Sequence, residues 1–261
     1  MTVDDTAPAV VEVHGLSKTF GQVAALRDVS LTVGRGEIVV LLGLSGSGKT
    51  TLLRHINGLE SPTSGSLTVL GEDLGALRGR ELRKMRGRIG MVFQQFHLVS
   101  RLTVLENVLT GALAGLRGPR LGIAAYPRDL RRRALSQLDR VGLLDKAYQR
   151  ADTLSGGQQQ RVAIARALMQ SPEILLADEP VASLDPESSD QVMALLREIA
   201  AENQLTVVCS LHQVELALVW GQRIVGMRSG SVVLDSPAAE MTRETAMRIY
   251  GRMTASLAES K

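Results

Sequence analysis

Short strand-like runs alternate along this chain with longer segments in which apolar residues recur at helical spacing. The runs that carry most of the hydrophobic signal span residues 37–42, 88–93, 174–178, 206–211, 224–227 and 231–235. Apolar runs of this length are typical of strands buried on both faces of a parallel sheet. Segments 51–56, 131–141 and 159–169 have helical patterns instead. The alternation predicts an α/β fold with a mixed, largely parallel sheet and flanking helices.

Two departures from this alternation predict the domain organisation. The turn at 61–65 introduces a run at 66–70 that we expect in a small antiparallel β layer. Between about residues 95 and 153 the strand-like runs stop, and Thr103-Val-Leu-Glu106 has the form of a capping box at the start of a helix. The Gly- and Pro-rich stretch 115–127 predicts a surface loop.

We therefore expect a single domain over residues 1–261. Its core, which includes the antiparallel layer, is predicted at 11–94 and 166–235, its helical lobe at 95–165, and a short helical tail at 236–261.

The clearest chemical motif is at residues 43–50, which read Gly-Leu-Ser-Gly-Ser-Gly-Lys-Thr and fill the phosphate-binding pattern G-x-x-x-x-G-K-[ST]. It lies between a strand-like run and a helical segment, which is the context that this motif requires. Glycines allow backbone N–H groups to surround phosphate oxygens at a helix N-terminus. Lys49 can then contact the β- and γ-phosphates, and the Thr50 hydroxyl can ligate Mg²⁺. The motif predicts binding of a nucleoside triphosphate.

A second motif, Leu154-Ser-Gly-Gly-Gln158, opens the helical segment 159–169. Taken alone it is ambiguous, because a Ser N-cap after a turn has the same form as an anion site at a helix N-terminus. Together with the following Gln-Gln-Arg-Val-Ala-Ile-Ala-Arg166, it resembles the signature sequence of ATP-binding-cassette ATPases. Other motifs of that family occur in the family's order from about Val11 to about Asp235. The resemblance implies a P-loop NTPase core with an inserted α-helical lobe, and ATP and Mg²⁺ as cofactors.

The run 174–178 ends in Asp178, and Glu179 follows it. Ligands of open α/β sheets bind at the C-terminal ends of the strands, so Asp178 can reach the Mg²⁺ of a nucleotide on the phosphate loop. Glu179 is then the candidate general base for the attacking water, or the group that orients it. An exposed acidic strand end is the alternative, but the continuation Pro-Val-Ala-Ser-Leu-Asp185 matches the family's catalytic strand and its following loop. Asp185 also precedes a proline, as an N-cap residue does, and the resemblance makes it face the partner subunit.

Three further residues are assigned by the resemblance. Gln94 matches the family's glutamine loop, which contacts Mg²⁺ or water and links the ATP site to the membrane subunit. His212 matches the switch histidine that touches the γ-phosphate, although a lone His after a strand is usually structural or solvated. Phe20 matches the aromatic residue that stacks on adenine, with a core Phe as the ordinary alternative.

These assignments define the candidate site. The catalytic candidates are Glu179, His212, Lys49 and Gln94. The ATP-binding candidates are Phe20, Gly43, Leu44, Ser45, Gly46, Ser47, Gly48, Lys49, Thr50 and Thr51. The candidate Mg²⁺ ligands are Thr50, Gln94 and Asp178. The signature residues, which in the family bind the ATP of the partner copy, are Leu154, Ser155, Gly156, Gly157 and Gln158, with Asp185 in the dimer loop.

Composition and length narrow the function. The 261 residues contain a single phosphate loop and no internal repeat, which predicts one cassette. The one cysteine, Cys209, cannot form an internal disulfide and is expected to be a small buried residue. The first residues do not have the pattern of a secretory signal, and no apolar run approaches the roughly 20 residues of a bilayer span. We therefore expect a soluble protein, and the family resemblance implies that it is peripheral to the cytoplasmic face of the inner (plasma) membrane and powers a separate membrane subunit.

Charge argues against a nucleic-acid partner. Lys and Arg total 30 against 27 Asp and Glu, so the net charge is only +3. Basic clusters lie at 78–88 and 128–133, but nucleic-acid binding is helped by stacking aromatic residues, and the chain has three Phe, three Tyr and one Trp. Solvated helical faces are the better interpretation of both clusters, and no nucleic-acid partner is expected.

Two classes of function remain: an ATPase that powers a transporter, and a nucleotide-dependent binding switch with little turnover. Glu179 and His212 favour the ATPase, because a switch could dispense with a hydrolytic base. The stretches 93–112, 154–161, 182–188 and 211–215 resemble those of phosphonate-import ATPases, whereas the loop 115–127 matches nothing that we can assign. Phosphite or another oxyanion and polar amino acids are the alternative cargoes.

The resemblance implies partners as well as cargo. We expect a homodimer formed on ATP binding, docked on two membrane-spanning permease subunits and fed indirectly by an extracytoplasmic phosphonate-binding protein.

Overall fold

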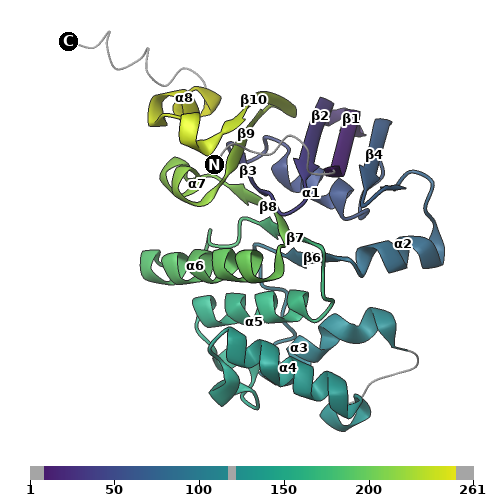
Figure 1. Cartoon of the computed structure of the whole chain (residues 1–261), viewed down its shortest axis with the longest axis vertical. Helices are drawn as coiled ribbons and strands as arrows, with labels where there is room; N and C mark the ends of the chain where they lie inside the picture. Colours follow the sequence, from purple (N-terminus) through teal and green to yellow (C-terminus); the bar gives the residue numbers. More distant parts are fainter. Residues whose placement is uncertain (1–8, 117–121, 251–261) are drawn as a thin grey trace. The chain divides into compact units, whose positions relative to one another are not determined.

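The structure is a computed structural model that describes residues 9–116 and 122–250 (Figure 1). The chain forms two compact units, which are described separately. Unit 1 comprises the chain up to Leu77 and from Thr206 onward, and unit 2 comprises Arg78–Leu205.

Unit 1 contains an antiparallel sheet and a set of parallel strands. The antiparallel sheet has the order β2-β1-β4-β5, with β1 at Ala9–Phe20, β2 at Val23–Gly34, β4 at Ser64–Val69 and β5 at Glu72–Asp73. The parallel set consists of β3 (Ile38–Leu42) between β8 (Thr206–Leu211) and β9 (Arg223–Arg228), and β10 (Ser231–Pro237) pairs with β9 in the antiparallel direction. Every residue of β3 and β8 is buried, which explains their uninterrupted apolar sequences.

The helices of unit 1 are short. They are α1 (Lys49–Ile56), α7 (Val214–Trp220), α8 (Arg243–Met247) and the 3₁₀ turns η5 (Ala238–Glu240) and η6 (Arg248–Tyr250). The strands of unit 1 confirm several predictions from the sequence. These are the antiparallel layer, the strands at 206–211, 224–227 and 231–235, and the burial of Cys209.

Unit 2 contains two parallel strands, β6 (Ile89–Val92) and β7 (Ile174–Asp178), and most of the helices. Its helices are α2 (Gly79–Arg86), α3 (Val104–Leu109), α4 (Arg128–Arg140), α5 (Gly156–Leu168) and α6 (Pro186–Asn203). Short 3₁₀ turns complete it: η1 (Thr110–Gly115), η2 (Ile123–Ala125), η3 (Leu144–Lys146) and η4 (Ala151–Thr153). Helices α3, α4 and α5 pack on one another. The segment in which the strand-like runs stop is thus mainly helical, as the sequence predicts.

Local sequence signals set the ends of several helices. The predicted capping box of α3 is confirmed, because the Thr103 hydroxyl accepts from the Glu106 N–H at 3.1 Å and the Glu106 carboxylate accepts from the Thr103 N–H at 2.8 Å. The predicted surface loop 115–127 is less simple, because Tyr126 is buried and a 3₁₀ turn precedes it. Residues 117–121 of that loop lie outside the described residues. Within the described ranges, no helix is long and apolar enough to cross a membrane.

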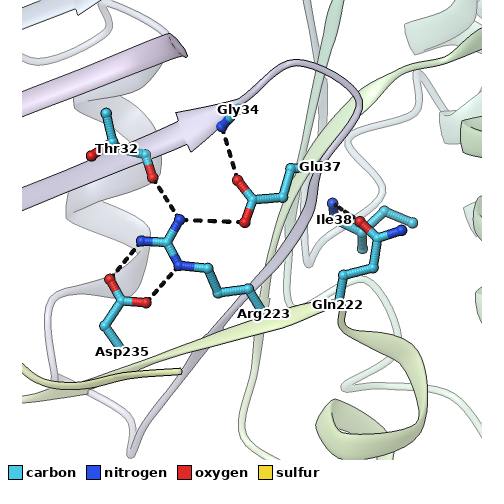
Figure 2. A network of polar contacts seen from close by, with 7 residues as sticks. All are labelled: Thr32, Gly34, Glu37, Ile38, Gln222, Arg223 and Asp235. Carbon is cyan, nitrogen blue, oxygen red and sulfur yellow. Dashed lines mark hydrogen bonds and ion pairs between the residues drawn. The ribbon is translucent and has the colours of Figure 1, made fainter. Parts of the chain in front are cut away.

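An ion-pair network in unit 1 ties the antiparallel sheet to the parallel strands (Figure 2). The Arg223 guanidinium, at the start of β9, donates two hydrogen bonds of 2.6 Å to Asp235 of β10 and one of 2.9 Å to the carbonyl oxygen of Thr32 in β2. It also lies 3.3 Å from the carboxylate of Glu37, which accepts from the Gly34 N–H at 2.8 Å. The hydrogen bonding of the guanidinium to the Asp235 carboxylate is the largest of the effects that raise the pKa of Arg223.

Replacement of Arg223 by Ala is expected to lower the free energy of unfolding by roughly 1–3 kcal/mol, because it leaves the buried Glu37 carboxylate without this cation. Urea unfolding of the two proteins measures this difference. Arg243→Ala is the matched control: its ion pair with Glu215 is 72% and 66% exposed, so we expect a change below about 0.5 kcal/mol. Equal losses in the two variants would contradict the structural role of the network.

Candidate functional site

The phosphate-binding motif forms a tight turn between β3 and α1 in unit 1. Gly46 and Gly48 have φ values of 79° and 106°, a backbone region in which L side chains are strained. Lys49 begins α1, and its ammonium group donates to the carbonyl oxygens of Gly43 at 2.7 Å and Leu44 at 3.1 Å. The lysine is buried, and its ammonium group is held against the main chain of the loop.

The loop still carries donors for an anion. The Ser47 Oγ is buried without a hydrogen-bond partner among the described residues. Thr50 and Thr51, in the first turn of α1, are half-buried, and Leu44, Ser45 and Gly46 at the tip are exposed. A phosphate group at this helix N-terminus would meet a buried ammonium, a buried hydroxyl and the positive end of the helix dipole.

Close backbone contacts hold this loop in place. A side chain on Gly43 would put its Cβ 2.3 Å from the Met227 carbonyl oxygen, and one on Gly48 would put it 2.8 Å from the Ala25 carbonyl oxygen. The loop is further bonded to Gly230, whose N–H donates to the Ser47 carbonyl oxygen at 3.0 Å. The β9–β10 turn therefore belongs to the loop's support, a role that we did not assign from the sequence. The Ser-Gly pair at 229–230 is a turn signal, but it does not indicate what the turn touches.

Two other candidate residues lie in unit 1. β8 pairs with β3 in parallel register, Leu42 opposite Leu211, so His212 and Gly43 follow at the same edge of the sheet. The side chain of His212 is exposed. Phe20 ends β1 and is 46% exposed, which excludes the alternative of a core Phe, and the Lys18 ammonium lies 4.7 Å from its ring centroid.

The acidic candidates and Gln94 lie at the same edge of the β6–β7 pair in unit 2. β6 and β7 are parallel, with Val92 opposite Ala177, so Gln94 and Glu179 lie at the same level beyond the strands. Asp178 is buried at the end of β7, whereas Glu179 is half-buried and has φ 45°. A non-glycine residue in this left-handed region carries strain of about 1–2 kcal/mol, and such residues concentrate at functional sites.

The signature residues form the N-terminus of α5. Ser155 is an exposed N-cap, and Gln158 completes a capping box: its side-chain oxygen accepts from the Ser155 N–H at 3.1 Å. Leu154 is buried and anchors the motif. A side chain on Gly157 would put its Cβ 2.9 Å from the Ser188 Cβ in the first turn of α6, so both helix N-termini lie close together. The two interpretations of Ser155 are compatible, because a capping serine still presents its hydroxyl at a helix N-terminus suited to an anion.

Asp185 is the N-cap of α6, with Pro186 at the first helical position, as the sequence predicts. Its carboxylate accepts from the Ser188 N–H at 2.9 Å. Hydrogen bonds from the Ser188 side chain and backbone lower the pKa of Asp185, so it is a stable anion at the surface.

Arg166 is a functional candidate that sequence reasoning missed. It lies in α5 and donates to the carbonyl oxygens of Phe96 at 2.8 Å and His97 at 2.5 Å, which belong to the segment after Gln94. Burial lowers its pKa. Arg166 therefore ties the glutamine segment to the signature helix, and its position at the end of the signature motif was the only sequence signal.

A basic cavity of about 930 Å³ also lies in unit 2. Both basic clusters contribute to its lining, with Arg80, Arg83, Lys84 and Arg88 from the first and Arg133 from the second. Arg88 is paired with Glu173 at 2.6 Å, whereas the side chains of Arg80, Arg83 and Lys84 are exposed and form no ion pair with any described residue. The exposure of these three side chains agrees with the interpretation of a solvated face, and part of each basic cluster also lines a common cavity.

Comparisons with known proteins agree with these features. The family model described as ABC transporter matches residues 26–182. A protein of Frankia casuarinae named "Phosphonates import ATP-binding protein PhnC" is 64% identical over 94% of this chain and 96% of its own. A protein of Mycolicibacterium smegmatis named "Phosphate-import ATP-binding protein PhnC" is 58% identical over 94% of this chain and 93% of its own.

Solved structures show the same fold. The dimeric structure of MJ0796, a bacterial ABC transporter cassette, is 38% identical and has a TM-score of 0.77 over 87% of this chain and 98% of its own. The same cassette in a post-hydrolysis state, bound to ADP and phosphate, has a TM-score of 0.76 over 87% of this chain and 98% of that one. The fold is thus that of a P-loop NTPase cassette, and the chain belongs to the ATP-binding-cassette transporter family.

Proposed function

We propose that this chain is the ATP-hydrolysing subunit of an importer for phosphonates. The observation that carries the proposal is the 64% identity, over 94% of this chain, to a protein named for phosphonate import. As a cassette of this family it uses ATP, and hydrolysis drives transport through a partner in the membrane. In this proposal the chain lies at the cytoplasmic face of the plasma membrane, bound to two permease subunits. An extracytoplasmic phosphonate-binding protein delivers the phosphonate to these subunits.

The proposed division of labour follows the chemistry of each side chain. Lys49 and the loop 43–51 bind the phosphates, Phe20 stacks on adenine, and His212 contacts the γ-phosphate. Glu179 accepts a proton from the attacking water or orients it. Thr50, Gln94 and Asp178 supply hydroxyl, amide and carboxylate oxygens, a donor set suited to Mg²⁺, which when bound neutralises charge that develops on the phosphates.

Two copies of the chain are proposed to close on two ATP molecules. Each nucleotide would meet the phosphate loop, Asp178 and Glu179 of one copy and Ser155 and Gly157 of the other. The dimeric cassette structure of a relative supports this arrangement. ATP binding then drives closure, and hydrolysis with phosphate release reopens the dimer.

Glu179→Gln is expected to leave ATP binding intact, slow hydrolysis by about 10²–10⁴ and accumulate the closed dimer. Light scattering with saturating ATP measures the dimer, and phosphate release measures the rate. Glu198→Gln makes the same change at an exposed position of α6 and should behave as wild type. A Glu179→Gln protein that stays monomeric with ATP bound would count against the sandwich dimer, and full turnover would remove Glu179 from the catalytic role.

We further propose that the basic cavity receives the cytoplasmic segment of the permease. One part of its lining is cationic, with Arg80, Arg83 and Lys84, and another is apolar, with Leu116 and Leu130. A partner helix with an apolar face and acidic side chains would complement both. The low aromatic content of the chain and its net charge of +3 make nucleic acid a poor occupant.

Arg83→Glu is expected to leave ATP turnover of the isolated chain unchanged and to weaken its binding to the permease roughly 10-fold or more, because like charges meet across the interface. Pull-down of the coexpressed permease and transport in cells measure the effect. Arg132→Glu places the same charge change on α4 outside the cavity and should bind normally. Equal binding by the two variants would exclude the cavity as the docking site.

Phosphate is the competing cargo, because a relative that is 58% identical is named for phosphate import. The residues of an ATP site do not discriminate the two, since the cargo is bound by other subunits. The experiment is therefore genetic: deletion of the gene should abolish growth on an alkylphosphonate as sole phosphorus source and spare growth on limiting phosphate.

The complementing variants sharpen this test. Wild type should restore growth on the phosphonate, and Lys49→Ala should not, because the phosphate loop loses its cation. A growth defect confined to limiting phosphate would transfer the assignment to phosphate, and unimpaired growth on both sources would reject both cargoes.

A further inference from the structure

The C-terminal segment Arg243–Tyr250 lies against the part of unit 1 that carries His212 (Figure 1). Helix α8 contacts α7, and the turn η6 contacts β9. Ile249 and Ala246 are 2% and 0% exposed, so the segment is anchored by burial. Gly226 of β9 makes room for the anchor, because a Cβ there would lie 2.6 Å from the Ile249 Cδ1.

Tyr250, next to this anchor, reaches the loop between β8 and α7. Its hydroxyl donates to the carbonyl oxygen of His212 at 2.6 Å. Only His212 and Gln213 separate the end of β8 at Leu211 from the start of α7 at Val214, and both have exposed side chains. Burial therefore does not fix the direction of the His212 side chain, whereas the hydrogen bond from Tyr250 holds its main chain.

We propose that Tyr250 is a positioning residue for ATP hydrolysis: it fixes the peptide plane that follows His212 and thereby the direction of the imidazole. The inference rests on the proposed ATPase function, in which His212 contacts the γ-phosphate. The segment Arg243–Tyr250 then contributes to catalysis in its own subunit, although in this proposal it supplies no group to the nucleotide. Arg243 adds a link to the neighbouring helix α7 through its 3.0 Å ion pair with Glu215, but this pair is exposed and contributes little.

The expected cost of losing the hydroxyl follows from the size of one hydrogen bond. Tyr250→Phe keeps the ring and its packing and removes only the donor. We expect kcat for ATP hydrolysis to fall about five-fold, with KM for ATP unchanged, because the interaction orients a group that acts on the transferred phosphate. Tyr148→Phe removes the same atom from a side chain that is 70% exposed and should have wild-type kinetics.

A double-mutant cycle with His212→Ala separates positioning from general stability. If Tyr250 acts through His212, Tyr250→Phe should cause no further loss of single-turnover rate in the His212→Ala background. A structural role alone would lower the rate by the same factor in both backgrounds. Thermal unfolding, in which we expect a shift of at most about 4 °C, gives the independent measure of folding.

The outcomes are distinct. A wild-type rate for Tyr250→Phe, or an equal loss in both backgrounds, would overturn the positioning role while the ATPase assignment stands. A wild-type chain without ATP turnover would overturn the proposed ATPase function and this inference with it.

Discussion

The close packing of backbone at the phosphate loop is the constraint on which the rest of unit 1 depends. Gly43 and Gly48 lie so near to the carbonyl oxygens of Met227 and Ala25 that no side chain fits. Such contacts fix the loop relative to β2 and to the β9–β10 turn without help from mobile side chains. Loops in general are mobile, so a binding loop needs a support of this kind to present its N–H groups in one arrangement.

The Arg223 network acts at the opposite end of the same strands. It joins β2, β9 and β10 to Glu37, the residue before β3, so the strand that delivers the phosphate loop is held at both ends. The arginine is partly buried and its ion-pair partners are carboxylates, so these pairs contribute more to the stability of the fold than an exposed ion pair does. The start of β3 is therefore held by electrostatic interactions, and its end is held by steric contacts of the backbone.

In unit 2, as in unit 1, the candidate residues lie on separate elements. Gln94 and Glu179 follow paired strands, and Ser155 and Asp185 begin neighbouring helices. Arg166 connects two of these elements through main-chain carbonyls, so it acts on position and not on chemistry. Tyr250 has the same character in unit 1. Side chains that bind carbonyl oxygens in this way are not found by sequence motifs, because a motif contains only the residues that contact the ligand.

The sequence by itself determined the continuously apolar strands, the phosphate loop, the acidic strand end and the helix caps at Thr103 and Asp185. These depend on local physics: the burial of a continuous apolar run, the φ freedom of glycine and the short reach of a capping side chain. Only the tertiary structure decided which distant segments touch. The contacts of Gly230 with Ser47, of Arg166 with Phe96 and of Tyr250 with His212, and the convergence of two basic clusters on one cavity, join residues far apart in the chain. A pattern that repeats over a few residues carries no information about such contacts, because they are set by how whole elements pack.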